Sequence, residues 1–161
     1  FKGKGKHVER KPEGVRAKTA KDFEVRKTPV RYAITLLVHS PELVTQIENP
    51  EKLLEWELPG VELLVKLVAT IEECHDIHAA ALLERFRGTV HEKTLLKLML
   101  WQPQAVDEEL LKREFQDCLQ RMKAQATDKA IERLLAKDQT QGLTESEKHD
   151  LFSLLQDRST K

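Results

Sequence analysis

The stretch from Val106 to Gln141 constrains the fold more than any other part of the chain. Its apolar residues recur every three or four positions for about eight turns, with no proline or glycine among them. The recurring positions are Leu111, Phe115, Cys118, Met122, Ala126, Ala130 and Leu134. We therefore predict one long helix, or two nearly continuous helices with a bend near residues 124–128, ending at Gln141-Gly142.

A second helix is predicted directly after this one. Thr144 and Glu147 have the spacing of a capping box, in which each side chain accepts a hydrogen bond from the other residue's backbone N–H. The apolar residues Leu151, Phe152, Leu154 and Leu155 follow. The two helices form an αα-hairpin. Because two helices bury little apolar surface, the hairpin either folds back on the rest of the chain or offers that surface to a partner.

The part of the chain before the long helix predicts a compact bundle of short helices. A capping residue followed by proline marks three helix starts, at Thr28-Pro29, Ser40-Pro41 and Asn49-Pro50. Residues 61–74 are apolar around most of the helix circumference, which is typical of a central buried helix. The fold class is therefore all-α: a compact helical bundle followed by a long helix and a C-terminal αα-hairpin.

The charges divide the chain into a basic N-terminal segment and a mildly acidic body. The chain has 27 Lys and Arg against 27 Asp and Glu, but residues 1–23 hold eight basic against three acidic residues, which leaves the remainder at −5. Residues 1–24 have too few aliphatic side chains to form a core, so we expect a flexible basic linker. We assign residues 25–125 to the helical bundle and residues 126–161 to the hairpin.

The cysteine content and the hydropathy predict a cytoplasmic protein. Cys74 and Cys118 are the only cysteines, too few for a disulfide framework in a chain of this length. No run approaches the roughly 20 apolar residues of a membrane span, and no signal peptide is present. The chain begins at Phe1 rather than at Met, which we interpret as a piece of a longer protein.

No group of residues in the sequence has the pattern of a catalytic or metal site. Cys74, His75 and His78 lack the second pair of ligands that a structural zinc site needs, so we interpret them as surface histidines beside a buried thiol. Glu72-Glu73 and Glu108-Glu109 are neighbours on predicted helices and point about 100° apart, as on a solvated face. We expect no catalytic centre, no metal site and no cofactor.

A basic patch lies at the predicted start of the first helix. Arg26, Lys27 and Arg31 oppose the helix macrodipole, which favours acidic groups at this end. They either hold an acidic ligand together with the dipole or simply mark the end of the basic linker. Composition alone favours the second interpretation.

Several runs of residues occur in an order and spacing that are specific when taken together. They are residues 26–34, 36–38 and 41–43, Leu58-Pro59-Gly60, residues 84–89, Phe115-Gln116-Asp117, and Gly142-Leu143-Thr144 with Glu147, Leu151, Phe152 and Gln156. These runs resemble the C-terminal helicase-binding domain of bacterial replicative DNA primases, over residues 25–161. The resemblance implies a non-catalytic interaction domain of a parent with a zinc-binding domain and an RNA polymerase domain.

The resemblance implies a first partner, the replicative helicase. The hairpin would dock on the N-terminal domains of the helicase hexamer, and so recruit and regulate primer synthesis at the replication fork. The implied contact residues are Leu151, Phe152, Leu155 and Gln156, with Arg158 near the rim.

A second implied partner is the acidic C-terminal tail of single-stranded-DNA-binding protein. Its site would consist of Arg26, Lys27, Val30 and Arg31, with Lys97 nearby. The resemblance thus favours the ligand-binding interpretation of the basic patch. The alternative function is a helical nucleic-acid-binding module that acts through residues 1–23, although the acidic body argues against strong duplex DNA binding.

Overall fold

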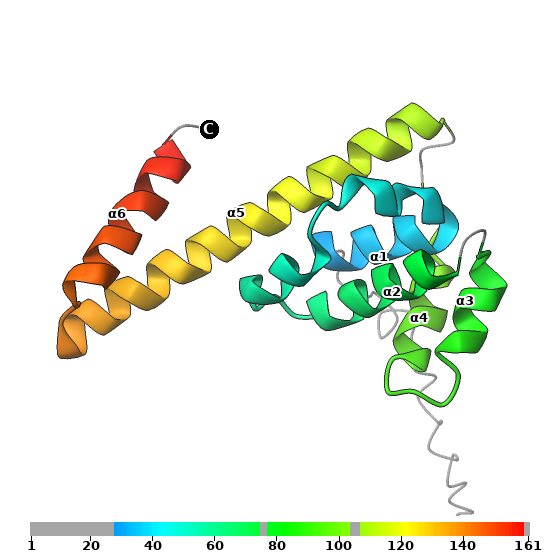
Figure 1. Ribbon diagram of the computed structural model, residues 1–161, viewed down its shortest axis with the longest axis horizontal. Helices are drawn as coiled ribbons and strands as arrows, with labels where there is room; N and C mark the ends of the chain where they lie inside the picture. Colours follow the sequence, from blue (N-terminus) through cyan, green and yellow to red (C-terminus); the bar gives the residue numbers. More distant parts are fainter. Residues whose placement is uncertain (1–27, 75–76, 104–106, 160–161) are drawn as a thin grey trace, which may run out of the picture.

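The computed structural model describes residues 28–74, 77–103 and 107–159, and within these ranges it contains helices and no strand (Figure 1). The elements are α1 (Pro29–His39), the 3₁₀ helices η2 (Pro41–Gln46) and η3 (Pro50–Trp56), α2 (Val61–Glu73), α3 (Ala79–Arg85), α4 (Glu92–Met99), α5 (Glu108–Gln141) and α6 (Glu145–Ser159). The predicted all-α class, a helical bundle followed by a long helix and a hairpin, is confirmed.

The three predicted helix starts all begin helical elements. Thr28 caps α1, because its Oγ1 accepts a hydrogen bond from the Arg31 amide at 3.3 Å, and Pro29 opens the first turn. The other two prolines begin 3₁₀ helices of six and seven residues, and neither has a side-chain cap bond. Both are longer than most 3₁₀ helices, which seldom exceed three or four residues.

Helices α1 and α2 form the centre of the bundle. Helix α1 contacts α2, α4 and α5 and is buried along almost its whole length. The predicted burial of the second central helix is confirmed by Val61, Leu63, Leu64, Leu67, Val68 and Ile71. Each aliphatic side chain buried in this way stabilises the fold by about 1.5–3 kcal/mol. The buried hydroxyl of Thr35 lies 3.0 Å from the Arg31 carbonyl oxygen and 3.4 Å from that of Leu98, which joins α1 to α4.

Helix α5 is one continuous helix of 34 residues, without a bend over residues 124–128 that would divide it. Its first half packs Phe115, Cys118 and Met122 into the core of the bundle. Its second half projects beyond the bundle, and α6 folds back from its end (Figure 1). The helix runs uninterrupted through the expected subdomain boundary at residues 125–126.

A second contact holds α5 to the bundle beyond that boundary. Lys129 Nζ donates to the Glu57 carbonyl oxygen at 2.8 Å, and Arg133 Nη1 lies 3.2 Å from Glu57 Oε2. Glu57 ends η3 in the left-handed region, at φ 48°. We call Glu57, Lys129 and Arg133 the Glu57 clasp. It fixes the course of α5 before the helix leaves the bundle.

Among the described residues, the helices are too short or too polar to cross a membrane.

Candidate functional site

The turn between α5 and α6 is built by local hydrogen bonds that the sequence predicted. The Glu147 amide donates to Thr144 Oγ1 at 3.3 Å, and the Thr144 amide donates to Glu147 Oε2 at 3.0 Å. The predicted capping box is thus confirmed. Gly142 ends α5 with φ 75°, a backbone conformation that favours glycine. The turn reverses the chain sharply and brings α6 back along α5.

Ion pairs link the two helices at both ends of the hairpin. Near the turn, Lys137 Nζ donates to Glu147 Oε1. This contact, together with the hydrogen bond from the Thr144 amide, lowers the pKa of Glu147 from 4.5 to about 2. At the open end, Arg158 Nη1 lies 3.6 Å from Asp128 Oδ1. The two pairs lie at opposite ends of the contact between α5 and α6.

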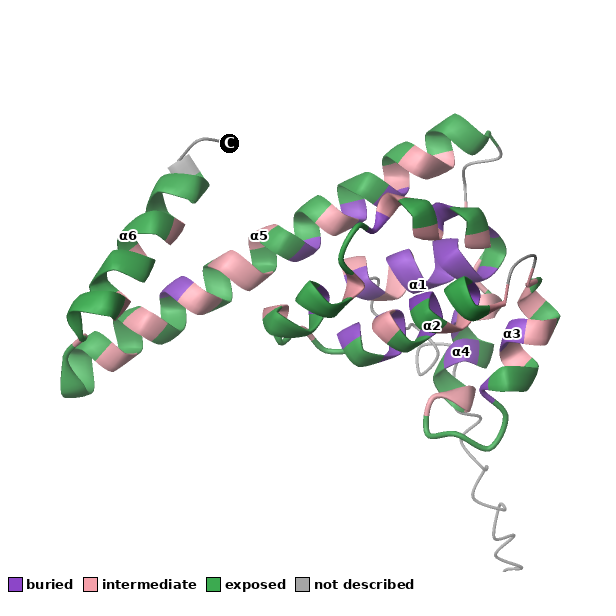
Figure 2. Ribbon diagram, in the orientation of Figure 1, coloured by how far each residue is buried: buried purple, intermediate pink, exposed green. Residues whose placement is uncertain are grey.

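The hairpin buries part of its apolar surface and leaves the rest exposed. Ile131 is buried, and Leu151 and Leu154 of α6 are half-buried. On α6, however, Phe152 is 61 % exposed and Leu155 is 42 % exposed. Figure 2 shows that the exposed class covers most of α6. The expected unsealed apolar surface on the hairpin is therefore present.

The structure places the hairpin residues singled out from the sequence on α6, at different depths. Leu151 lies toward α5 and is half-buried, so it contributes to the packing of the hairpin itself. Phe152, Leu155 and Gln156 are exposed. Arg158 is exposed as well and pairs with Asp128. The residues with accessible surface are therefore Phe152, Leu155, Gln156 and Arg158.

The basic patch at the start of α1 is only partly described. Arg26 and Lys27 lie outside the described residues, as do residues 1–23, on which the nucleic-acid-binding alternative depends. Arg31 is half-buried and Lys97 is exposed. Because the Thr35 hydroxyl lies near the Leu98 carbonyl, the helices that carry Arg31 and Lys97 are neighbours. That Arg31 and Lys97 contact the same ligand stays a prediction.

The structure places Val30, which was expected at the peptide site, in the core of the bundle. Its side chain is 2 % exposed and belongs to the core. It packs so closely on Gly60 that a Cβ atom there would lie 3.3 Å from Val30 Cγ1. The start of α1 therefore packs closely against the start of α2. An apolar ligand group at this end of the bundle must contact other residues.

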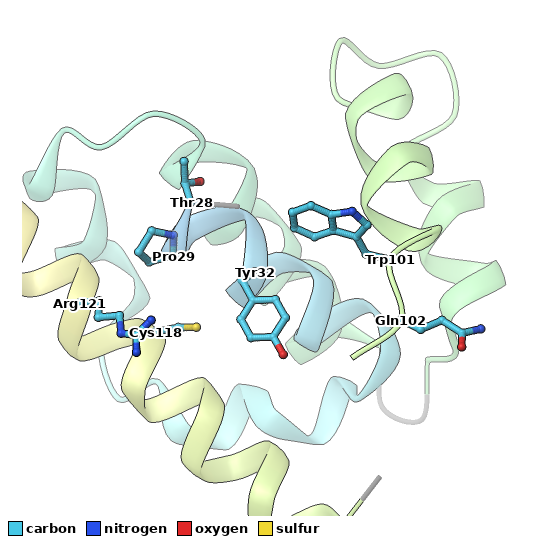
Figure 3. Close-up of a pocket in the computed structure, with 7 residues that line it drawn as sticks. All are labelled: Thr28, Pro29, Tyr32, Trp101, Gln102, Cys118 and Arg121. Atoms are coloured by element: carbon cyan, nitrogen blue, oxygen red, sulfur yellow. The ribbon is translucent and has the colours of Figure 1, made fainter. Parts of the chain in front are cut away.

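A pocket of about 320 Å³ opens between α1, α5 and the segment after α4 (Figure 3). It is lined by Thr28, Pro29, Tyr32, Trp101, Gln102, Cys118 and Arg121. No pattern in the sequence predicts this pocket, because its walls come from the start of α1 and from segments about 70 to 90 residues later in the chain. Tyr32 is fixed there by its hydroxyl, which donates to Glu114 Oε2 at 2.6 Å. The lining combines two aromatic rings with one guanidinium group.

The thiol in this pocket is unsuited to nucleophilic chemistry. Cys118 is buried, and this burial raises its pKa to about 11, against an opposing effect of the Arg121 charge. The side chain is therefore a neutral thiol at neutral pH. Since the thiolate is the reactive form, Cys118 is a packing residue of the pocket wall.

The other candidate groups have structural partners. Cys74 was expected to be buried, but it is half-buried and accepts a hydrogen bond from Arg85 Nη2 at 3.0 Å. Glu108 and Glu109 do not converge, since each pairs with a cation one turn later, at 2.6 Å and 3.0 Å. His75 lies outside the described residues. Within the described part of the chain, no three His, Cys, Asp or Glu side chains group as metal ligands.

The chain is similar in sequence to several bacterial DNA primases. The family described as DNA primase DnaG, DnaB-binding, matches residues 30–154. The DNA primase of Escherichia coli K12 is 35 % identical over 138 residues, which are 86 % of this chain and 24 % of that protein. The DNA primase of Haemophilus influenzae is 37 % identical over 133 residues, covering 82 % and 22 %. The chain therefore spans about a quarter of the length of these relatives.

A solved structure agrees with the sequence relatives. The crystal structure of the DnaG primase C-terminal domain from Vibrio cholerae matches with a TM-score of 0.62 and 28 % identity, over 80 % of this chain and 96 % of that one. The family match covers most of the chain, from the start of α1 to Leu154 on α6. This chain belongs to the DnaB-binding family of the bacterial DNA primase DnaG.

Proposed function

We propose that this chain docks on a DnaB-type replicative helicase through the exposed side of the α5–α6 hairpin. The observation that carries the proposal is the exposure of Phe152 and Leu155 on a hairpin that projects from the bundle. Exposed large apolar side chains that cluster on a projecting element are typical of a protein interface. The family to which the chain belongs is described by its binding to DnaB, which supports the same partner.

The energetics suit a contact that forms and releases repeatedly. Burying each apolar anchor contributes about 1.5–3 kcal/mol, and ordering of the interface offsets part of this gain. Two anchors with a polar rim correspond to binding that is stable at the concentrations of a replication complex but still reversible. A primase that acts repeatedly on one template needs such reversibility.

The role of docking would be to tether a catalytic partner. A domain held on the helicase raises the effective concentration of an attached polymerase domain at the exposed template strand. The chain spans about a quarter of its primase relatives, so primer synthesis belongs to the rest of such a protein. In this proposal the chain itself is non-catalytic, and it recruits and regulates primer synthesis at the replication fork.

The direct test is a calorimetric titration of the chain with the N-terminal domain of the DnaB helicase from the same organism. We expect saturable binding of the intact chain. A separate sample with an isolated single-stranded oligonucleotide, at rising salt, tests the nucleic-acid-binding alternative. Binding to the oligonucleotide but not to the helicase domain would replace the proposal by that alternative.

We further propose that the start of α1 and the adjacent pocket bind the acidic C-terminal tail of single-stranded-DNA-binding protein. The pocket has the chemistry that such a peptide needs. Because Val30 is buried, the apolar end of the peptide would contact Tyr32 and Trp101 instead. Arg121 lines the same pocket, and Arg31 lies one turn after the pocket residue Thr28. Guanidinium groups beside an apolar pocket suit a carboxylate-rich peptide that ends in a hydrophobic residue.

A further inference from the structure

We propose that Leu135, on the distal half of α5, is a further contact residue of the helicase-docking face. This inference rests on the proposed docking of the hairpin. With Leu135 included, the helicase-docking face consists of residues from both α5 and α6 and is not limited to α6. Binding would then require α5 and α6 to be packed together, because neither helix alone carries all the contact residues.

The exposure of Leu135 is the first observation. Ile131, one turn earlier on α5, is 3 % exposed and lies on the side of the helix that α6 covers. Leu135 is 45 % exposed, between the 42 % of Leu155 and the 61 % of Phe152. A leucine one helical turn after Ile131 would ordinarily be covered by α6 as well. Its exposure places it at the edge of the α5–α6 contact rather than inside it.

The ion pair at the open end of the hairpin shows which edge this is. Asp128 and Leu135 are seven residues apart, so they lie within about 20° of each other around α5. Arg158 reaches Asp128 at 3.6 Å, and Leu155 lies on α6 three residues before Arg158. The pair therefore joins the edge of α5 that carries Leu135 to the edge of α6 that carries Leu155.

The second ion pair identifies the opposite side of α5. Lys137, which pairs with Glu147, is two residues from Leu135 and points about 160° away from it around the helix. On α6, Glu147 and Arg158 lie within about 20° of each other and both reach α5, and Leu155 and Phe152 lie about 60° and 120° from Arg158. Leu135 lies about 40° from Ile131 in the same rotational sense. Because the two helices run antiparallel, these three side chains lie on one side of the hairpin, and we call them the apolar edge. Asp128 and Arg158 border this edge at the open end of the hairpin.

The apolar edge suits an apolar groove on the helicase N-terminal domains rather than a charged surface. Its three members are large and uncharged, and the charges beside it already form a pair with each other. Complementarity to such a strip comes from apolar side chains on the partner. The continuity of Leu135 with Phe152 and Leu155 indicates the same partner for all three.

The test compares two leucines of similar exposure on the same helix. Leu110, on the first turn of α5, is 47 % exposed and lies far from the hairpin. We expect Leu135→Ala in the full chain to weaken binding to the helicase N-terminal domain about fivefold to tenfold. Leu110→Ala should change the affinity less than about twofold. Alanine is a good helix former, so neither change opposes α5.

Two further variants separate the possible failures. Leu135→Gln keeps the side-chain stem over the hairpin while removing its apolar end, and it should weaken binding as Leu135→Ala does, with helical circular dichroism retained. If Phe152→Ala weakens binding but both Leu135 variants behave like Leu110→Ala, the inference about Leu135 is overturned and hairpin docking stands. If Phe152→Ala also leaves the affinity unchanged, the proposed docking itself fails.

Discussion

Arg133 Nη1 lies 3.2 Å from Glu57 Oε2, and this contact joins the helix that carries the hairpin to the end of a short helix in the bundle. One turn earlier on α5, Lys129 donates to the carbonyl oxygen of the same residue at 2.8 Å. The hairpin therefore begins from a fixed point on the bundle. Without the Glu57 clasp, α5 would be held to the bundle only by its first half.

The Glu57 clasp leads to a prediction about backbone strain. Glu57 has φ 48°, where a non-glycine residue costs about 1–2 kcal/mol. Both ends of its ion pair with Arg133 are largely exposed, so the pair contributes about 0–1 kcal/mol. We expect Glu57→Gly to be more stable than Glu57→Ala by about 1 kcal/mol in urea unfolding, because only glycine relieves the strain.

A neighbouring glutamate provides the control for this comparison. Glu55 is exposed in η3 and has no positive φ. There the order should reverse, with Glu55→Gly less stable than Glu55→Ala by about 0.5–1 kcal/mol. Equal stability of the two Glu57 variants would show that the left-handed conformation of Glu57 is not strained.

The turn of the hairpin leads to a prediction about acid. The pKa of Glu147 is lowered from 4.5 to about 2, chiefly by the hydrogen bond from Lys137. Because the folded pKa lies below the unfolded one, Glu147 stabilises the hairpin fully above pH about 4.5, and this contribution is lost as the pH falls toward 2. The Thr144 amide, which donates to this carboxylate at 3.0 Å, reports the titration by nuclear magnetic resonance.

The expected result is a Thr144 amide shift with a midpoint near pH 2. Glu147→Gln keeps an oxygen acceptor for the Thr144 amide but removes the charge, so the transition should disappear. The same variant should leave the signals of the bundle core in place. A midpoint near the ordinary value of 4.5 would show that the Lys137 contact does not form in solution.

Local signals allowed much of this fold to be predicted from the sequence. The proline at each of the three early helix starts fixes φ and removes a backbone donor, and each one opens a helix. The capping box at Thr144 and Glu147 involves two residues three positions apart, so their spacing alone predicts the bond. The exposed apolar surface of α6 followed from the limited area that a two-helix hairpin can bury.

The features that the sequence did not predict depend on contacts between distant segments. The family resemblance implied that Val30 contacts a peptide, but Gly60 allows α2 to pack directly against it. The pocket at Tyr32 exists only because Trp101 and Cys118 are brought beside α1. The left-handed residue at the end of η3 is a glutamate, whereas glycine is the residue that signals this conformation.

The basic patch and the pocket lead to a prediction about an acidic peptide. Arg31→Glu should weaken binding of the C-terminal peptide of single-stranded-DNA-binding protein about tenfold or more at low salt, because it places a carboxylate against the carboxylates of the ligand. Arg121→Glu, in the pocket wall, should act in the same direction. Fluorescence anisotropy of the labelled peptide measures both effects.

The matched control for these charge reversals is Arg87→Glu. Arg87 is exposed on the turn after α3 and pairs with Glu84 at 2.8 Å, away from the pocket lining. It should leave the peptide affinity nearly unchanged. If all three reversals reduce the affinity equally, the peptide senses only the overall charge of the chain, and the pocket is not its site.

The most direct test of the account is the affinity of a Phe152→Ala, Leu155→Ala double variant for the helicase N-terminal domain, measured by calorimetry. Removing two exposed anchors should weaken binding about a hundredfold, while the helical circular dichroism stays the same. The matched control is Leu54→Ala, Leu110→Ala, which removes two leucines of 46 % and 47 % exposure elsewhere on the chain and should bind like the unmodified chain. Unchanged affinity of the Phe152→Ala, Leu155→Ala variant, with its helices intact, would contradict docking through the hairpin.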